Sequence, residues 1–173
     1  IGSGYLYPAF RGQIAYTTPN MNGLQVTLGI TNPDQGQDAS GLADYDDRFG
    51  LEGKAVYSMG SGKVWAGFSS YDVADSAGDY DATAGEIGAA FNAGNLGLVA
   101  YYYSGEGNGA GLGLNRLGAG LANERDNDGG YIQATYVIPS GTKLGVAVAT
   151  SSQDLAPGET AGGTAAHDSN DRW

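Results

Sequence analysis

The residues of this chain that could do chemistry by type and spacing are charged side chains within extended segments. Glu52 and Lys54 stand two residues apart, so in a β-strand they project to the same face. Arg11, Arg48 and Lys63 fall on the corresponding face of their own segments. Such a set would create an electrostatic field along a wall that faces water. Such a field would attract ions of opposite charge and would not make or break bonds.

Signals for catalysis or for a bound cofactor are weak. The chain has no cysteine, which excludes thiol catalysis and cysteine-zinc sites, and His167 is its one histidine. The run from Glu124 to Gly129 opens like an EF-hand loop, but Thr135 stands where the bidentate glutamate belongs. The glycine-rich run 105–113 lacks the G-x-G-x-x-G spacing. We therefore expect no enzymatic activity and no metal site among these residues.

The elements that carry the charged residues alternate in character from one residue to the next. In the stretch 129–151, two such runs are joined by a tight turn at Ser140 and Gly141. Period-2 alternation of this length predicts β-strands with two unlike faces. Eight segments of this kind can be marked, at about 10–19, 24–32, 47–59, 63–73, 83–93, 96–104, 129–139 and 142–152.

Short and long connections alternate strictly between these segments. The short ones are rich in turn-forming residues and lie at 20–23, 60–62, 94–95 and 140–141. The long ones cover about 33–46, 74–82, 105–128 and 153 to the end. A meander with short turns on one side and long loops on the other is typical of outer-membrane barrels.

Charge is confined to one face of the expected strands. The more apolar face carries no charged residue, whereas the opposite face holds Arg11, Arg48, Glu52, Lys54, Lys63, Glu86 and Lys143. An apolar exterior around a polar interior is the reverse of a water-soluble β-protein. We therefore predict an all-β, antiparallel up-and-down transmembrane β-barrel, of which about eight strands are present.

Aromatic rings on the apolar face are placed as two interfacial bands would require. Tyr16, Tyr57, Phe91 and Tyr136 precede the short turns, and Phe10, Phe49 and Tyr102 lie toward the long loops. The alternative explanation is that tyrosine is simply common in strands. The equivalent depth and face of the first four favour the bands.

Composition restricts the partners and the setting. The net charge of −11 argues against nucleic acid, because phosphate binding needs a basic surface. No apolar run approaches the ~20 residues of a transmembrane helix. The first residue is Ile1 and no signal peptide is visible, so we expect a mature chain or an internal piece of one.

Blocks spread over nearly the whole chain resemble one family. They include YLYPAFRGQIAYTTPNMNGLQVTLGI, DDRFGLEGKAVYS, KVWAGF, LVAYYYSGEGNG and NERDNDGGYIQATYVIPSGTKLGVAVATSS. The chain is similar in them to the general trimeric porins of Gram-negative outer membranes. Such porins have sixteen strands, a loop folded into the pore and usually a C-terminal phenylalanine. This chain has eight readable strands and ends in DSNDRW within an expected long loop. The resemblance implies that residues 1–173 form a single porin barrel domain, incomplete at both ends.

The resemblance also implies a function and a site. It implies a water-filled channel in the bacterial outer membrane for passive diffusion of ions and small hydrophilic solutes. Arg11, Arg48 and Lys54 are the candidates for the basic side of the constriction, with Glu52 and Lys63 nearby; ordinary solvated lumen charges are the alternative. Expected partners are outer-membrane lipid and lipopolysaccharide, with a homotrimer as the assembly.

Acidic residues gather in the expected long loops. They are Asp34, Asp38, Asp44, Asp46, Asp47, Asp72, Asp75, Asp79 and Asp81. We expect no cofactor apart from loosely bound Ca²⁺ or Mg²⁺ at these loops, and a solvated acidic rim is the simpler interpretation.

Two other functions compete with the channel, and the sequence favours the channel over both. One is a closed eight-stranded structural barrel or adhesin without an open pore. Such a barrel should fill its interior with bulky side chains, but the inward positions here are mostly small, with Trp65, Tyr101 and Tyr103 as exceptions. The other is an outer-membrane hydrolase, for which this stretch lacks the catalytic residues.

Overall fold

The structure is a computed structural model that describes residues 12–32, 34–35, 49–74, 80–107, 119–120, 123–154, 156 and 169–172. The described residues form twelve β-strands. They are β1 (Gln13–Thr17), β2 (Leu24–Thr31), β3 (Asp34–Gln35), β4 (Gly50–Met59), β5 (Gly62–Ala74), β6 (Tyr80–Ala93), β7 (Leu96–Glu106), β8 (Ala119–Gly120), β9 (Asn123–Glu124), β10 (Asp126–Val137), β11 (Lys143–Gln153) and β12 (Ser169–Arg172). Within the described ranges, no helix is long and apolar enough to cross a membrane.

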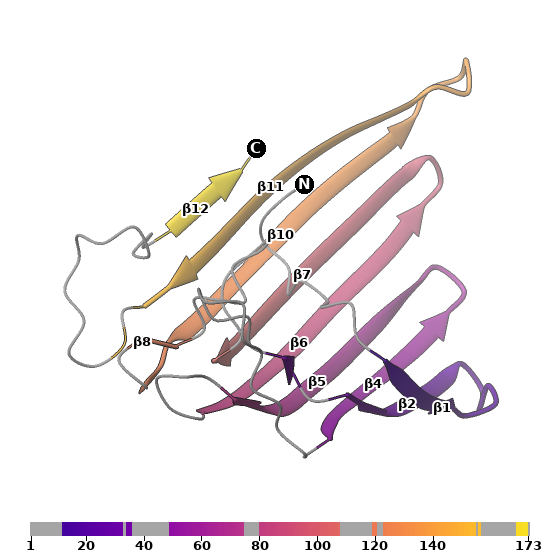
Figure 1. Cartoon of the computed structure of the whole chain (residues 1–173). Coiled ribbons are helices and arrows are strands. Elements are labelled where there is room, and N and C mark those ends of the chain that lie inside the picture. Colours follow the sequence, from indigo (N-terminus) through magenta and orange to yellow (C-terminus); the bar gives the residue numbers. More distant parts are fainter. Residues whose placement is uncertain are drawn as a thin grey trace.

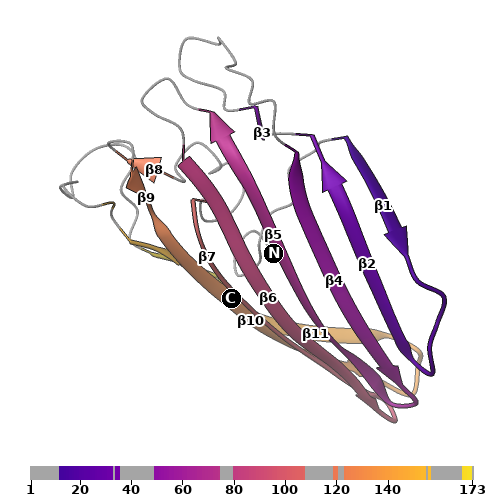
Figure 2. The ribbon, with the colours of Figure 1, turned by 90° about the horizontal axis from the view of Figure 1, so that it is seen from below.

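One antiparallel meander contains the eight expected strands in chain order. The strand order is β1-β2-β4-β5-β6-β7-β10-β11-β12, and the short β3 pairs in parallel with β5. Figures 1 and 2 show a single curved sheet, with the short turns together at one end and the long connections at the other. The predicted fold class and all eight predicted strands are confirmed.

The short turns have the backbone that tight hairpins need. Asn22 and Gly23 have φ angles of 54° and 97°, in the left-handed region that asparagine and glycine enter most readily. The side-chain carbonyl of Asn20 accepts a hydrogen bond from the Gly23 N–H at 2.7 Å. This turn fixes the register between β1 and β2, in which Tyr16 lies opposite Leu28.

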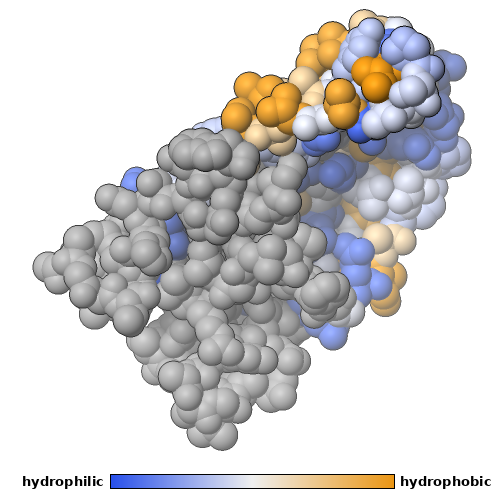
Figure 3. Space-filling view, turned by 90° about the horizontal axis from the view of Figure 1, so that it is seen from above, coloured by the Kyte–Doolittle hydropathy of each residue, from blue (hydrophilic) through white to orange (hydrophobic). Residues whose placement is uncertain are grey.

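The two faces of the sheet differ as the alternation predicts. Large apolar side chains stay exposed on one face, which we call the outer face, for example Ile132 at 62% and Val146 at 67%. The opposite, inner face carries Glu52, Lys54, Lys63 and Glu86, because each is an odd number of residues from an outer-face position on its own strand. The view in Figure 3 shows hydrophilic residues in the middle of the described surface and hydrophobic residues toward its margins.

The positions of the aromatic rings near the turns indicate how strongly the strands are tilted. Tyr16, Tyr57, Phe91 and Tyr136 are all exposed on the outer face. The hydrogen-bonded row that starts at Tyr16 reaches β10 at Asp128, and Tyr136 stands eight residues further toward its turn. With a rise of ~3.3 Å per residue and a spacing of ~4.8 Å between strands, rings at one depth require a strand tilt of about 40°. Membrane barrels have strand tilts of roughly 35–45°.

The second expected aromatic band is less regular. Phe49 and Tyr102 are exposed on the outer face, and Phe10 lies outside the described residues. Tyr102 pairs with Ile87 and Gly130, well inside the sheet, because β7 continues to Glu106. Tyr102 therefore lies in the half of β7 nearer the long connection, as expected, but four residues before the strand ends.

The strands are longer at the loop end than the alternation predicts. β6 begins at Tyr80 and β10 at Asp126, in regions expected to be loops. Asp126 lies opposite Glu106, and Asp128 opposite Ser104. Polar residues can extend the backbone ladder here, because beyond the apolar band no lipid-facing position has to be filled.

The end of the chain corrects a further expectation. The sequence predicted that DSNDRW lies within a long loop, but Ser169–Arg172 forms β12, which pairs with β11 from Ser152 to Ala149. A segment of four polar residues has no alternation that could reveal a strand. Short strands β8 and β9 likewise occur inside the expected long connection 105–128.

Candidate functional site

The inner face is crossed by polar contacts between strands that are not neighbours. Gln13 Nε2 on β1 donates a hydrogen bond to Glu52 Oε2 on β4 at 2.6 Å, with Gly29 of β2 between them. Lys54 Nζ on β4 lies 2.8 Å from Glu86 Oε1 on β6, with Gly67 of β5 between them. In both cases the intervening strand contributes a glycine.

The glycines explain how these pairs can form. A Cβ placed on Gly67 would lie 3.0 Å from Cγ of Glu86, and one on Gly29 would lie 3.1 Å from Nε2 of Gln13. Both distances are tighter than ordinary van der Waals contact, so a side chain at either glycine would make these atoms move by a few tenths of an ångström. Small wall residues therefore bring charged side chains together across two strand spacings.

Glu86 is the centre of the best-connected cluster. Its Oε1 accepts from Lys54, and its Oε2 accepts a hydrogen bond from the Tyr101 hydroxyl at 2.8 Å. The Lys54 side chain is 48% exposed and the Glu86 side chain is 19% exposed. Because the pair remains open to water, its contribution to stability is small. Its effect is instead on the field that a solute meets at this face.

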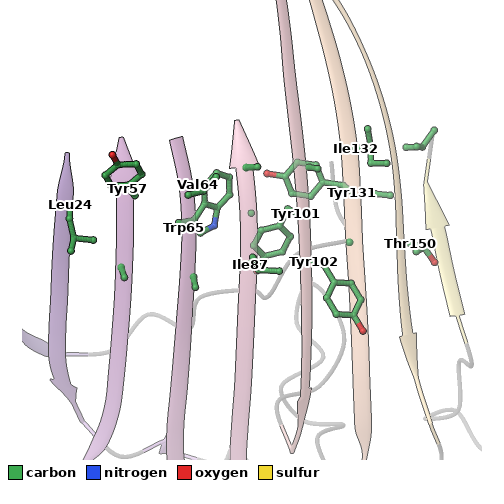
Figure 4. Close-up of a pocket in the computed structure, with 18 residues that line it drawn as sticks. Leu24, Tyr57, Val64, Trp65, Ile87, Tyr101, Tyr102, Tyr131, Ile132 and Thr150 are labelled. Atoms are coloured by element: carbon green, nitrogen blue, oxygen red, sulfur yellow. The ribbon is translucent and has the colours of Figure 1, made fainter. Parts of the chain in front are cut away.

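Aromatic side chains lie beside this cluster on the same face. The ring centroids of Trp65 and Tyr101 are 6.5 Å apart, and those of Tyr101 and Tyr131 are 5.4 Å apart. Figure 4 shows these side chains on β5, β7 and β10. They are among the residues around an open apolar groove of about 890 Å³, most of which, such as Tyr57, Tyr102 and Ile132, belong to the outer face.

The loop end of the inner face is closely packed. Tyr103 has no exposed surface, and Asn127, Ser151 and Gln153 are buried. The Tyr103 ring covers Gly129 of the next strand, where a Cβ would approach the ring to 2.6 Å. Among the described side chains of this face, those of Thr31, Ser69 and Asn127 have buried polar atoms without a described protein partner. Such atoms are usually satisfied by ordered water.

The residues proposed for a constriction can be placed only in part. Glu52, Lys54 and Lys63 share the inner face, whereas Arg11 and Arg48 lie outside the described residues. Glu52 and Lys54 do not contact each other; each is held by a residue two strands away. Whether these residues form a constriction stays a prediction.

Sequence reasoning missed Glu86 and the aromatic row as members of one cluster. The alternation does place Glu86, Trp65 and Tyr101 on the inner face. The pairing register, which brings them to one level, cannot be read from any single strand.

The acidic residues of the expected outer rim are partly strand residues. Asp72 and Asp81 are direct partners at the loop ends of β5 and β6, and the other seven have side chains outside the described set. Among the side chains that are described, no three acidic or histidine residues are grouped so as to hold a metal ion. Loose binding of divalent ions by the acidic loops is therefore still a prediction.

A comparison with known protein families decides the identity. A sequence model of the Gram-negative porin family matches residues 3–172. The chain belongs to the Gram-negative porin family. It is an outer-membrane channel protein of the bacterial envelope, in a family that is not enzymatic. No curated protein and no solved structure matches the chain. For a porin, the outer face of the sheet is the lipid side and the inner face is the water side.

Proposed function

We propose that this porin forms a water-filled channel through which ions and small hydrophilic solutes diffuse passively. The observation that carries this proposal is the division of the sheet into an apolar outer face and a charged inner face. The described inner wall is also rich in glycine and alanine, as an open lumen allows. The conductance of the protein in planar lipid bilayers tests the proposal: stepwise currents in KCl support it, and their absence contradicts it.

We further propose that the charges of the inner face set the ionic preference of the channel. Arg11, Arg48 and Lys54 would form the basic side, with Glu52 and Lys63 nearby. The support is that Glu52, Lys54 and Lys63 share one face and keep their charges in reach of water. Replacing Arg11 and Arg48 with glutamine should raise the preference for cations. An unchanged reversal potential in a KCl gradient would remove both residues from the constriction.

Additional strands should complete the barrel. In the described part of the chain, β1 pairs only with β2, and β12 pairs only with β11. Free backbone groups at a sheet edge are costly in lipid, so each edge needs a partner strand. A closed eight-stranded barrel would instead pair β1 with β11, and that pairing is absent from the described sheet.

The surroundings of the channel belong to the same proposal. We expect a homotrimer in the outer membrane, with lipopolysaccharide around its outer end. Asp72 and Asp81 are direct partners at the loop ends of β5 and β6, so two carboxylates of the expected acidic rim lie close together. We propose that Ca²⁺ binds loosely at this end. If a calcium titration leaves the thermal stability of the protein unchanged, the proposed binding of Ca²⁺ is wrong.

A further inference from the structure

Three aromatic side chains form a continuous row on the inner face, which we call the aromatic shelf: Trp65, Tyr101 and Tyr131. The pairing register places them in one row, since Trp65 lies opposite Gly88, Gly88 opposite Tyr101, and Tyr101 opposite Tyr131. The planes of neighbouring rings differ by 28° and 25°. All three residues are partly exposed. Figure 4 shows the three rings arising from three different strands.

The glycine between the rings makes the shelf continuous. A Cβ on Gly88 would collide with the six-membered ring of Trp65. The indole therefore extends from β5 over β6 toward Tyr101 on β7. A wall made mostly of small residues thus carries one row of neighbouring aromatic rings that spans four strands, from β5 to β10.

Two cations lie over one end of the shelf. The ammonium nitrogens of Lys54 and Lys63 are 5.8 Å and 5.7 Å from the centroid of the Trp65 ring. Lys54 is neutralised by Glu86, which is also held by the Tyr101 hydroxyl. Lys63 is exposed and has no acidic partner among the described residues. Within the described part of the chain, an anion would therefore meet the positive charge of Lys63 beside an aromatic ring.

We infer that the aromatic shelf is a lumenal binding site for organic anions that combine a flat ring with one carboxylate. The inference rests on the proposed channel function and names a solute class for it. The ring stacks on Trp65 and Tyr101, and the carboxylate pairs with Lys63. The Lys54–Glu86 pair limits the site to a single net positive charge. Binding is weak, as a channel requires if the solute is to leave again.

The proposed ligands share a ring with a flat face and one carboxylate. Two solutes test which kind of ring the site binds. Benzoate offers an aromatic ring, and glucuronate offers a pyranose ring with apolar C–H groups. Acetate has the charge without the ring, and glucose has the ring without the charge. Each is added to the full-length protein in a planar bilayer, and the reduction of the KCl current is measured.

The expected result is a concentration-dependent block by benzoate, glucuronate or both, with little block by acetate or glucose. Trp65→Ala and Lys63→Gln should each raise the half-blocking concentration about fivefold. Gln133→Ala, at another inner-face position, is the matched control and should leave it unchanged. Each variant is normalised to its own KCl conductance. Trp65→Leu keeps bulk over Gly88 and replaces the alanine variant if the latter does not fold.

Other outcomes separate the two proposals. A normal KCl current with equal effects of benzoate, glucuronate and acetate overturns the shelf and leaves the channel intact. Absence of any KCl current overturns the channel. The shelf is then tested by saturation-transfer NMR of benzoate and glucuronate with the protein in detergent. If neither Trp65→Ala nor Lys63→Gln weakens the saturation-transfer signals, the proposal that the aromatic shelf binds these solutes is wrong as well.

Discussion

Lys54 and Glu86 form an ion pair of 2.8 Å across a strand to which neither belongs. Gly67 lies directly between them in the register and leaves the space above its backbone to their side chains. It places a positive and a negative charge of the inner wall at the same level, beside the ring of Trp65. Removing the positive charge of Lys54 and removing the negative charge of Glu86 should therefore shift the preference between cations and anions in opposite directions.

Neutralising each partner of this pair tests that relationship. Lys54→Gln leaves Glu86 unpaired and should shift the cation-to-anion permeability ratio upward by up to about tenfold. One unit charge ~6 Å from an ion in water favours a cation about threefold and disfavours an anion about threefold. Glu86→Gln should shift the ratio downward by a similar factor. The double variant should lie close to the wild type. Reversal potentials across a KCl gradient measure all three, and shifts of the same sign for both single variants would contradict the pairing.

The assignment of the two faces can be tested at neighbouring residues of β10. Ile132 is exposed on the outer face, and Gln133 lies on the inner face. Ile132→Arg should destabilise the membrane-inserted protein by about 2–4 kcal/mol if it lies near the bilayer midplane. Gln133→Arg should cost much less, since its charge remains in water. Chemical unfolding from lipid vesicles gives both values. Equal destabilisation would mean that the faces are not lipid and water.

Gly88 is expected to tolerate no side chain. A Cβ there collides with Trp65, so Gly88→Ala should lower the unfolding free energy by about 1–3 kcal/mol. Gly85 on the same strand is the matched control, because the nearest heavy atom to an added Cβ is 3.9 Å away. In a Trp65→Ala background, Gly88→Ala should lose most of its effect. Persistence of the full effect would show that the ring is not the cause.

The two free edges of the described sheet predict a larger barrel. The intact mass of the protein under denaturing conditions should be about twice the 17.6 kDa of the 173 residues, if further strands complete a sixteen-stranded barrel from the nine strands of the described antiparallel path. Chemical cross-linking in native membranes should then trap three copies. A mass of 17.6 kDa with a monomer would favour a small barrel and direct attention to what its loops bind.

The sequence predicted the strands well, because the alternation of apolar and polar residues that marks a strand lies entirely within that strand. Ile132 and Gln133 show the difference of the faces without reference to any other segment. The site could be predicted less completely, since the contacts of Lys54 and Trp65 depend on the register with strands about 20 or 30 residues away. The same limitation explains β12, where four polar residues pair with β11 without a pattern of their own. Arg11 and Arg48 lie outside the described residues, so their part of the prediction is still open.

The ring of Trp65 lying over Gly88 also has an evolutionary consequence. The two positions are direct cross-strand partners, so the space above position 88 is used by the residue at position 65. A relative that replaced the tryptophan with a small residue would be free to acquire a side chain at position 88. A relative that kept the tryptophan would have to keep the glycine. The two positions should therefore be inherited as a pair, and such a pair would mark related porins that retain an aromatic wall.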